Sequence, residues 1–267
     1  MELSPKLRPG TKDAIVRFIW ATLESADKNG VVLGLSGGLD SAVCARMGVE
    51  ALGKGNVHPI IMPYGKADER GVKDAIRVAE SLKLDYEILD IKSSCDEILK
   101  GLKRSGKETA GNVRARVRML MLYHRANADN LLVMGTGNKS EMLTGYFTKF
   151  GDGGADLMPI GDLYKTEVRE LAIMLDLPDW LIRKTPTAGL WPGQTDEGEL
   201  GIKYERLDRV LMGIEYLLPE DEIARLTSVP LKEVMRIKDI VDRNAHKRRL
   251  ALIPKLGHRT VGMDWRE

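Results

Sequence analysis

The stretch that decides the fold is Val31-Val32-Leu33-Gly34-Leu35-Ser36-Gly37-Gly38-Leu39-Asp40-Ser41. Its first five residues form a short apolar run, which is typical of a strand buried on both faces of a parallel sheet. A glycine-rich turn follows, and residues 41–52 then show a helical pattern. The order strand, loop, helix places the loop at the carboxyl end of a strand, where open parallel sheets bind their ligands.

The same alternation continues on both sides of this stretch. Further apolar runs occupy residues 57–62, 86–91 and 131–134, and helical patterns occupy residues 11–26, 67–82, 94–103 and 112–126. Strands that alternate with helices predict a parallel sheet covered on both faces. We therefore expect an α/β fold, with a doubly wound, mostly parallel sheet of about five strands.

The strand signal ends at about residue 163. Helical patterns follow at 166–175, 200–217, 221–226 and 231–246, separated by prolines. We interpret residues 1–267 as a single domain, with an α/β core at about 11–163 and a helical C-terminal extension at about 164–267. Two long glycine-rich stretches, 145–159 and 185–201, are expected to be functional or mobile loops. We expect the first, which carries Lys149 and Asp156, to become ordered only when substrate binds.

Composition narrows the class of protein. The chain has 267 residues, and its 41 Lys and Arg against 39 Asp and Glu give a formal net charge of +2. Such a small charge does not favour nucleic acid or an anionic membrane as partner. No stretch approaches the ~20 apolar residues of a membrane span, and no signal peptide is evident. The isolated cysteines, Cys44 and Cys95, fit a reducing cytoplasm better than a disulfide scaffold.

The loop Ser36–Ser41 has the residues needed to bind phosphate. Its glycines let the backbone approach an anion, the N–H groups of the following helix point at it, and Ser36 and Ser41 add hydroxyl donors. Asp40 would repel a phosphate unless Mg2+ lay between them. The alternative interpretation is a glycine turn with a Ser/Asp helix cap.

The chain resembles the N-type ATP pyrophosphatases in this loop, and within that superfamily it resembles the NAD synthetases. The resemblance runs from the first strand to about Lys247. It is carried by residues 112–116 (NVRAR), 135–141 (GTGNKSE), 146–156 (YFTKFGDGGAD), 184–188 (KTPTA) and 246–248 (HKR).

The resemblance implies a two-step ligase reaction with ATP as co-substrate. The nicotinate carboxylate of deamido-NAD attacks the α-phosphorus of ATP and releases pyrophosphate, and ammonia then displaces AMP from the acyl adenylate to form NAD. The family requires no protein nucleophile. Its members are typically homodimers, and we consider the helix at 112–126, with Met119, Leu120, Leu122 and Tyr123, either part of that interface or ordinary core.

The resemblance also implies roles for particular residues. Asp40 and Glu141 would hold Mg2+. Contacts to ATP are implied for Gly34, Leu35, Ser36, Gly37, Gly38, Leu39, Asp40, Ser41, Thr136, Lys165 and Thr187. Contacts to deamido-NAD are implied for Arg116, Lys149, Asp156, His246 and Lys247.

Plainer interpretations exist for several of these residues. Glu141 could be a first-turn helix carboxylate, Lys165 a solvated residue at a helix start, and Thr187 a turn hydroxyl. The run beginning at His246 could be a nucleic-acid patch or a solvated helix end. Arg116 belongs to a basic stretch with Arg114 and Arg118, and residues two apart do not share a helix face. The carboxylates that look exposed and have no assigned role are Asp162, Asp196 and Glu197.

Two other functions compete with this interpretation. A different ATP pyrophosphatase, either a GMP-synthetase-type amidase or a tRNA-modifying enzyme, would keep the same loop, although the small charge and isolated cysteines disfavour the second. A regulator without catalysis should have lost Asp40 or Glu141, and both are present. Because the loop begins about 35 residues from the start of the sequence, we expect no glutaminase domain before it and ammonia as the nitrogen source.

Overall fold

The fold is built on a parallel sheet whose strands are short and buried. The computed structural model describes residues 3–65, 69–103, 106–191 and 193–261. Within these ranges the sheet has four strands in the order β3-β2-β1-β4. Their bounds are Gly30–Gly34 (β1), Val57–Ile61 (β2), Glu87–Ile88 (β3) and Leu131–Val133 (β4). All three pairings are parallel, which confirms the predicted fold class.

The expected count of about five strands is wrong in the described part of the chain. Beyond β4 the chain makes only an isolated bridge, between Met134 and Leu157, where the Gly135 N–H donates to the Leu157 carbonyl at 2.8 Å. Pro159 lies two residues after Leu157 and has no N–H to donate to the next hydrogen bond of a strand pairing. The fifth position of the sheet is therefore reduced to one bridge.

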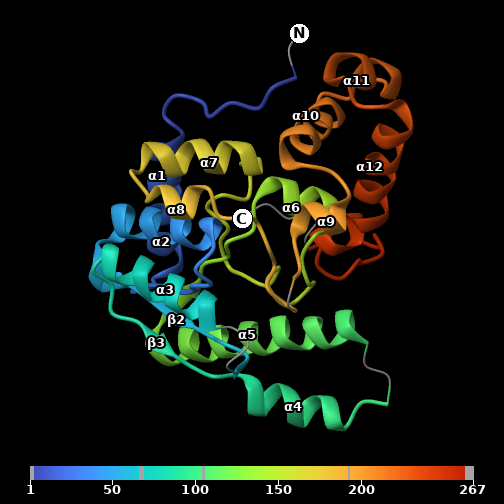
Figure 1. Cartoon of the computed structure of the whole chain (residues 1–267). Helices are drawn as coiled ribbons and strands as arrows, with labels where there is room; N and C mark the ends of the chain where they lie inside the picture. The colour runs from blue at the N-terminus through green and yellow to red at the C-terminus, as the bar shows by residue number, and fades with distance from the viewer. Residues whose placement is uncertain (1–2, 66–68, 104–105, 192, 262–267) are drawn as a thin grey trace.

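Helices cover both faces of the sheet (Figure 1). Alternate side chains of β1 therefore pack into two different cores. Val31 and Leu33 pack into one core with α1 (Thr11–Ala26), α2 (Leu39–Leu52), α3 (Glu69–Ser81), α7 (Lys165–Met174) and α8 (Asp179–Ile182). Val32, between them in sequence, packs into the opposite core with α4 (Lys92–Lys100) and α5 (Lys107–Asp129). The sheet is thus doubly wound, as the sequence predicts.

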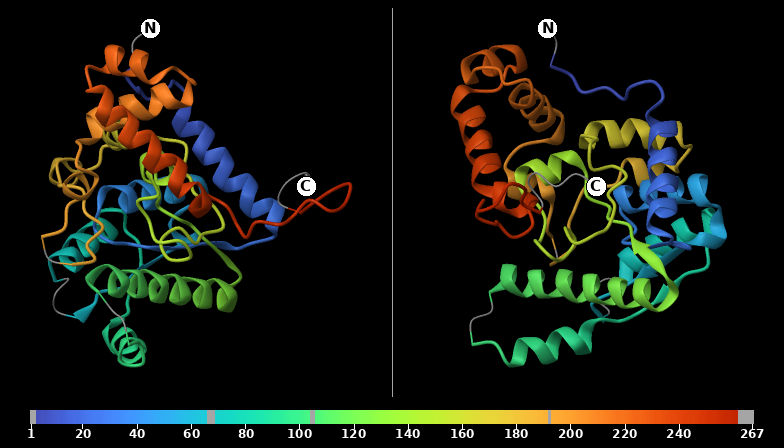
Figure 2. Two further views of the ribbon diagram at one scale, coloured as in Figure 1. Left: turned by 90° about the vertical axis from the view of Figure 1, so that its right-hand side faces the viewer. Right: turned by 180° about the vertical axis from the view of Figure 1, so that it is seen from behind.

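The C-terminal half is helical and has its own core. Its elements are α9 (Asp196–Leu200), α10 (Tyr204–Glu215), α11 (Glu220–Thr227), α12 (Leu231–Arg243) and the 3-10 helix η3 (Asn244–Arg248). They form a layer beside the sheet (Figure 2), around Tyr204, Leu207 and Leu211. The short helix α6 (Lys139–Thr144), which follows β4, contributes Leu143 to the same core. A further 3-10 turn, η1 (Lys54–Asn56), leads into β2.

A buried carboxylate ties the helical layer to two helices of the α/β core. Asp208, on α10, is fully buried and accepts hydrogen bonds from the Ser140 hydroxyl at 2.5 Å and from the backbone N–H and hydroxyl of Thr166, each at 2.9 Å. It therefore joins three helices, α6, α7 and α10. None of the helices in the described ranges is long and apolar enough to cross a membrane.

Candidate active site

A cleft of about 1140 Å³ opens at the carboxyl ends of the strands. It is lined by the residues that end β1, β2 and β4, including the glycine loop, Ile60–Tyr64 and Val133–Gly137. The chain runs from β1 to β2 and β3 on one side, and then crosses to β4 on the other. The cleft therefore lies at the switch point of the sheet, where doubly wound folds bind ligands.

The glycine loop has the geometry of an anion site. Ser36 and Ser41 hold it closed: their hydroxyl oxygens lie 3.1 Å apart, and the Gly38 N–H donates to Ser36 Oγ at 3.2 Å. Helix α2 begins directly after Gly38, so its first unpaired N–H groups face the cleft. Gly37 has a positive φ of 74°, and a Cβ there would lie 2.6 Å from the Gly71 carbonyl oxygen of α3. Only glycine fits at this position.

A lysine directly before the second glycine-rich stretch supports this loop. Lys184 donates to the Gly37 carbonyl at 2.8 Å and to Asp74 Oδ2, on α3, at 2.5 Å. The sequence analysis gave neither residue a role. Lys184 opens the motif at residues 184–188, a signal that could have marked it, whereas Asp74 has the appearance of an ordinary charge on an amphipathic helix.

A buried charge cluster lies beside the loop. The Lys165 ammonium, 3% exposed, pairs with Asp40 Oδ2, and Asn138 Nδ2 donates to Asp40 Oδ1 at 3.2 Å. Glu141 closes a capping box on α6, since its carboxylate accepts the Asn138 N–H at 3.1 Å. Glu141 therefore does act as a carboxylate in the first turn of a helix, and it also lines the cleft with Asp40 and Lys165.

The pKa values in this cluster reflect its burial. Burial opposes the charge of Lys165, but the carboxylates of Asp40 and Glu141 outweigh it and raise the pKa of the ammonium. Burial and the nearby Asp40 charge raise the pKa of Glu141 well above its usual value. Burial raises the pKa of the Cys44 thiol in the same way, so Cys44 is an unreactive core residue.

The donor set fits Mg2+. Asp40 and Glu141 supply hard carboxylate oxygens at the wall of the cleft, and a divalent cation between them would relieve the repulsion that raises the pKa of Glu141. Within the described ranges, no group of three or more His, Cys, Asp or Glu side chains is arranged to hold a metal. The oxygens of a bound phosphate would therefore complete the coordination, as is usual for Mg2+.

The two predicted threonine contacts line the same cleft. Thr136 follows β4 at the sheet edge. Thr187 lies across from it in the loop 183–195, where its Oγ1 accepts the Gly189 N–H at 3.1 Å. That bond is the turn contact given as the plain alternative, and it leaves the hydroxyl hydrogen of Thr187 for another acceptor.

The residues predicted to contact deamido-NAD do not all line the cleft. Lys247 lines the cleft, where its ammonium donates to the carbonyls of Gly145 and Phe147 at 2.5 and 2.7 Å. Three others gather outside the cleft lining: Arg116 Nε donates to the Lys149 carbonyl at 3.3 Å, and Lys149 Nζ donates to the His246 carbonyl at 2.7 Å.

Asp156 stands apart from that group. Its carboxylate accepts the Val133 N–H at 2.7 Å and the Tyr123 hydroxyl at 3.0 Å. Burial and the charge of Asp156 raise the pKa of Tyr123 to about 12. Asp156 therefore also has a structural role, because it fastens the glycine-rich loop to β4.

Helix geometry selects other arginines for the cleft. Arg114 and Arg118 are four residues apart on α5 and so share one face, whereas Arg116 is exposed. Arg114 stacks 3.7 Å from the centre of the Tyr64 ring and donates to the Leu190 carbonyl. Arg118 Nε donates to the Met62 carbonyl at 3.0 Å.

Of the three unassigned carboxylates, only Asp162 is exposed, since Asp196 is buried and Glu197 is half-buried. Asp196 is 3% exposed and lines the cleft with Lys165 and Glu141. The expectation of an exposed residue is wrong because α10 covers it with Tyr204, whose hydroxyl donates to Asp196 Oδ2 at 3.2 Å. Glu197 accepts the Tyr204 N–H at 3.1 Å, and Asp162, 96% exposed, pairs with Lys139 at 3.0 Å.

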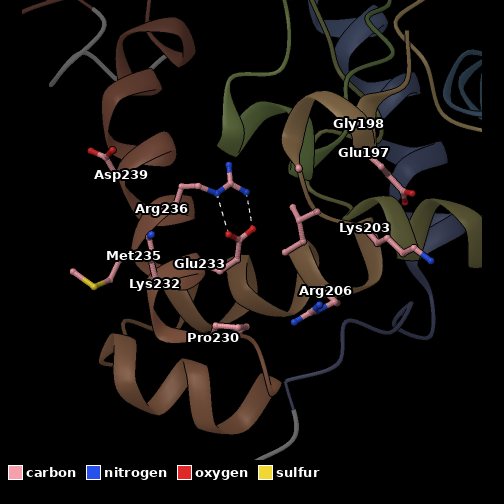
Figure 3. A pocket seen from close by; sticks show the side chains of 12 residues that line it. Glu197, Gly198, Lys203, Arg206, Pro230, Lys232, Glu233, Met235, Arg236 and Asp239 are labelled. Atoms are coloured by element: carbon pink, nitrogen blue, oxygen red, sulfur yellow. Dashed lines mark hydrogen bonds and ion pairs between the residues drawn. The ribbon is translucent and has the colours of Figure 1, made fainter. Parts of the chain in front are cut away.

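A second hollow, of about 1060 Å³, lies on the helical layer between α9, α10 and α12. Figure 3 shows Arg236 and Glu233 pointing toward each other in its wall. They form a bidentate pair, in which Arg236 Nη2 donates to Glu233 Oε1 at 2.7 Å and Nε donates to Oε2 at 3.1 Å. Its charges include both signs, among them Arg206, Lys232 and Asp239. The hollow contains none of the motif residues identified from the sequence, so we place the active site in the cleft.

Comparison with known proteins agrees with this assignment. The NAD synthase family model matches residues 11–251. The NH3-dependent NAD+ synthetase of Methanococcoides burtonii is 45% identical over 240 residues, which cover 89% of this chain and 91% of that protein. The NMN synthetase of Francisella tularensis superimposes with a TM-score of 0.81 at 34% identity, covering 92% of this chain and 98% of that one. The NH3-dependent NAD synthetase of Campylobacter jejuni, solved with a nitrate ion, gives 0.78 at 33% identity, covering 92% and 97%. The chain therefore belongs to the NAD synthase family.

Proposed function

We propose that this protein is a ligase that amidates deamido-NAD with ammonia at the expense of ATP, releasing AMP and pyrophosphate. The observation that carries the proposal is the meeting of the glycine loop with Asp40, Glu141 and Lys165 in one cleft at the sheet's switch point. The similarity to NH3-dependent NAD+ synthetases supports the choice of acid and of nitrogen donor.

The first step uses the phosphate-binding part of the cleft. The N–H groups that open α2, with Ser36 and Ser41, bind the pyrophosphate end of ATP. Lys165 offsets negative charge at the α-phosphate when the nicotinate carboxylate attacks it. Asp40 and Glu141 would hold Mg2+, which supplies charge neutralisation on the leaving pyrophosphate.

The second step needs no group from the protein as nucleophile. Ammonia attacks the carbonyl carbon of the acyl adenylate, the bond from that carbon to the AMP oxygen breaks, and the nitrogen gives up a proton as the amide forms. The chain contributes by positioning the two substrates and by keeping the phosphate charge compensated.

The dinucleotide would extend from the cleft over Lys247 toward Arg116, Lys149 and His246. Lys247 supports this path because it lines the cleft and lies next to His246 in η3. Two large apolar side chains beside the same patch, Leu120 and Phe150, are 60% and 52% exposed. A second copy of the chain packed there would bury them and would place deamido-NAD near the interface of a homodimer. We place the protein in the cytoplasm, where both nucleotides occur.

Product analysis tests the proposal. Incubation with deamido-NAD, ATP, Mg2+ and ammonium should yield NAD, AMP and pyrophosphate in equal amounts, and glutamine in place of ammonium should yield little NAD. Nicotinate mononucleotide is the matched alternative acid, because a structural neighbour is an NMN synthetase. Faster amidation of the mononucleotide would show that it, and not deamido-NAD, is the preferred acid. Cleavage of ATP to AMP without formation of either amide would contradict the proposal.

A further inference from the structure

The buried carboxylate Asp196 has an acceptor oxygen that the protein does not use. Its Oδ2 accepts the Tyr204 hydroxyl, whereas Oδ1 is buried without a hydrogen-bond partner. A carboxylate oxygen left unpaired in the interior costs free energy, so such a group calls for a missing donor. Asp196 lines the cleft, and the donor can therefore come from a ligand.

The polar side chains next to Asp196 direct their hydrogen bonds to other acceptors. The Tyr146 hydroxyl donates to Glu199 at 2.6 Å, and Gln194 Nε2 donates to the same carboxylate at 3.0 Å. Burial raises the pKa of Asp196, and a hydrogen-bond contact with the Tyr146 hydroxyl opposes that rise. The hydroxyl has a single hydrogen, so while it donates to Glu199 at 2.6 Å it offers Asp196 only a lone pair.

The result is a pocket of acceptors at the wall of the active-site cleft. Besides Asp196 and Tyr146, it faces the carboxylate of Glu141, and all three residues line the cleft. Lys165, a cation near them, is paired with Asp40. A ligand that completes this pocket must be small, positively charged and able to donate several hydrogen bonds in different directions.

We propose that Asp196 and Tyr146 form the binding subsite for the ammonium co-substrate, an inference that rests on the proposed function. An ammonium N–H donates to Asp196 Oδ1, and a second donates to the phenol oxygen of Tyr146. Lys165, which the first step places at the α-phosphate, is close to Asp196, because its charge opposes the burial that raises the pKa of that carboxyl. The subsite is therefore close to the carbonyl that forms next to that phosphate.

The balance of the transfer is simple. The bound ammonium releases one proton to solvent through the open cleft and attacks as NH3. The new C–N bond forms while the bond from the carbonyl carbon to the AMP oxygen breaks, and the second proton leaves the nitrogen as the amide forms. Asp196 acts by concentrating the cation beside the electrophile, so it is a binding residue for the second step alone.

The test is Asp196→Asn, which keeps the shape of the side chain and removes its charge. The KM for ammonium should rise about 10- to 100-fold, the range expected for a lost hydrogen bond to a charged group. Exchange of labelled pyrophosphate into ATP, driven by deamido-NAD, reports the first step and should change less than threefold. Asp162→Asn is the matched control, because that carboxylate is 96% exposed, and its KM for ammonium should be unchanged.

Hydroxylamine separates cation binding from general damage. It is a nucleophile that is uncharged at neutral pH, so Asp196→Asn should slow its reaction less than threefold. An unchanged KM for ammonium, or an equal loss with both nucleophiles, would overturn the inference. If Asp196→Asn does not fold, Tyr146→Phe carries the same test, with a several-fold rise in the KM for ammonium alone. Failure of the proposed function itself would look different, because the unaltered protein would then show no exchange that depends on deamido-NAD.

Discussion

At the scale of one residue, Gly37 couples backbone conformation to phosphate binding. Its φ of 74° is costly for any residue with a Cβ, and that atom would lie 2.6 and 2.7 Å from backbone atoms of Gly71 and Ala75. Gly37→Ala therefore combines about 1–2 kcal/mol of backbone strain with displacement of the loop from α3. We expect the pyrophosphate exchange rate to fall at least about tenfold, because a loss of about 1.4 kcal/mol has that effect.

Gly55 provides the matched control for this substitution. A Cβ at Gly55 meets no atom within 4 Å, and the residue lies on the surface in η1. Gly55→Ala should leave the exchange rate unchanged. Equal activity in both variants would show that the loop tolerates a side chain and that its conformation is not tied to α3.

At the scale of the element, Asp208 makes the docking of α10 depend on pH. Burial raises the pKa of this carboxyl from 3.8 to about 6, although hydrogen bonds from Ser140 and Thr166 oppose the shift. Between these values the folded protein holds a proton that the unfolded chain has lost. The contribution of Asp208 to the free energy of unfolding therefore falls as the pH rises from about 4 to about 6, and it is level above that. The loss amounts to about 3 kcal/mol, since one pKa unit is about 1.4 kcal/mol.

Urea unfolding of Asp208→Asn checks this prediction. The variant cannot ionise at this position, so the stability of the unaltered protein relative to the variant should fall by about 3 kcal/mol between about pH 4 and pH 7. Asp221→Asn, on the exposed face of α11, is the control and should follow the unaltered protein at every pH. Parallel curves for Asp208→Asn and the unaltered protein would contradict the assignment.

Elements with a long periodic pattern could be predicted from the sequence, and the short ones could not. The apolar runs at 31–35 and 57–62 and the helices α1, α2 and α12 follow directly from local patterns. Helices α6, α8 and α9 have four to six residues each, too few for a period to show. Packing fixes them: α9 is held by the burial of Asp196 beneath Tyr204 of α10, a contact between two helices that the local sequence does not encode. The glycine loop was predictable because its chemistry is local, whereas Lys184 and Asp74 meet only through the tertiary fold.

At the scale of the whole molecule, the predicted deamido-NAD contacts that lie outside the cleft point to assembly of two copies of the chain. Arg116, Lys149 and His246 are joined by hydrogen bonds outside the lining of the cleft, and Leu120 and Phe150 are exposed beside them. Full burial of a large apolar side chain is worth about 1.5–3 kcal/mol, and roughly half of that remains to be gained at each of these two side chains, which favours a second copy at this face. Of the four residues considered for the interface, Leu120 has this exposure, whereas Leu122 and Tyr123 pack against the core of β4 and α5, and Met119 lines the cleft.

Leu120→Glu tests this arrangement. Placing an unpaired charge in an apolar contact costs several kcal/mol, so the unaltered protein should sediment at about twice the 29.7 kDa of one chain and the variant at the mass of one chain. The KM for deamido-NAD should rise at least about tenfold in the variant, with the KM for ATP little changed, because only the dinucleotide reaches this face. Met235→Glu, at a side chain 57% exposed on α12, is the control and should keep both the mass and the KM values. A dimer that survives Leu120→Glu, with an unchanged KM for deamido-NAD, would place the interface on another face and leave the dinucleotide within a single chain.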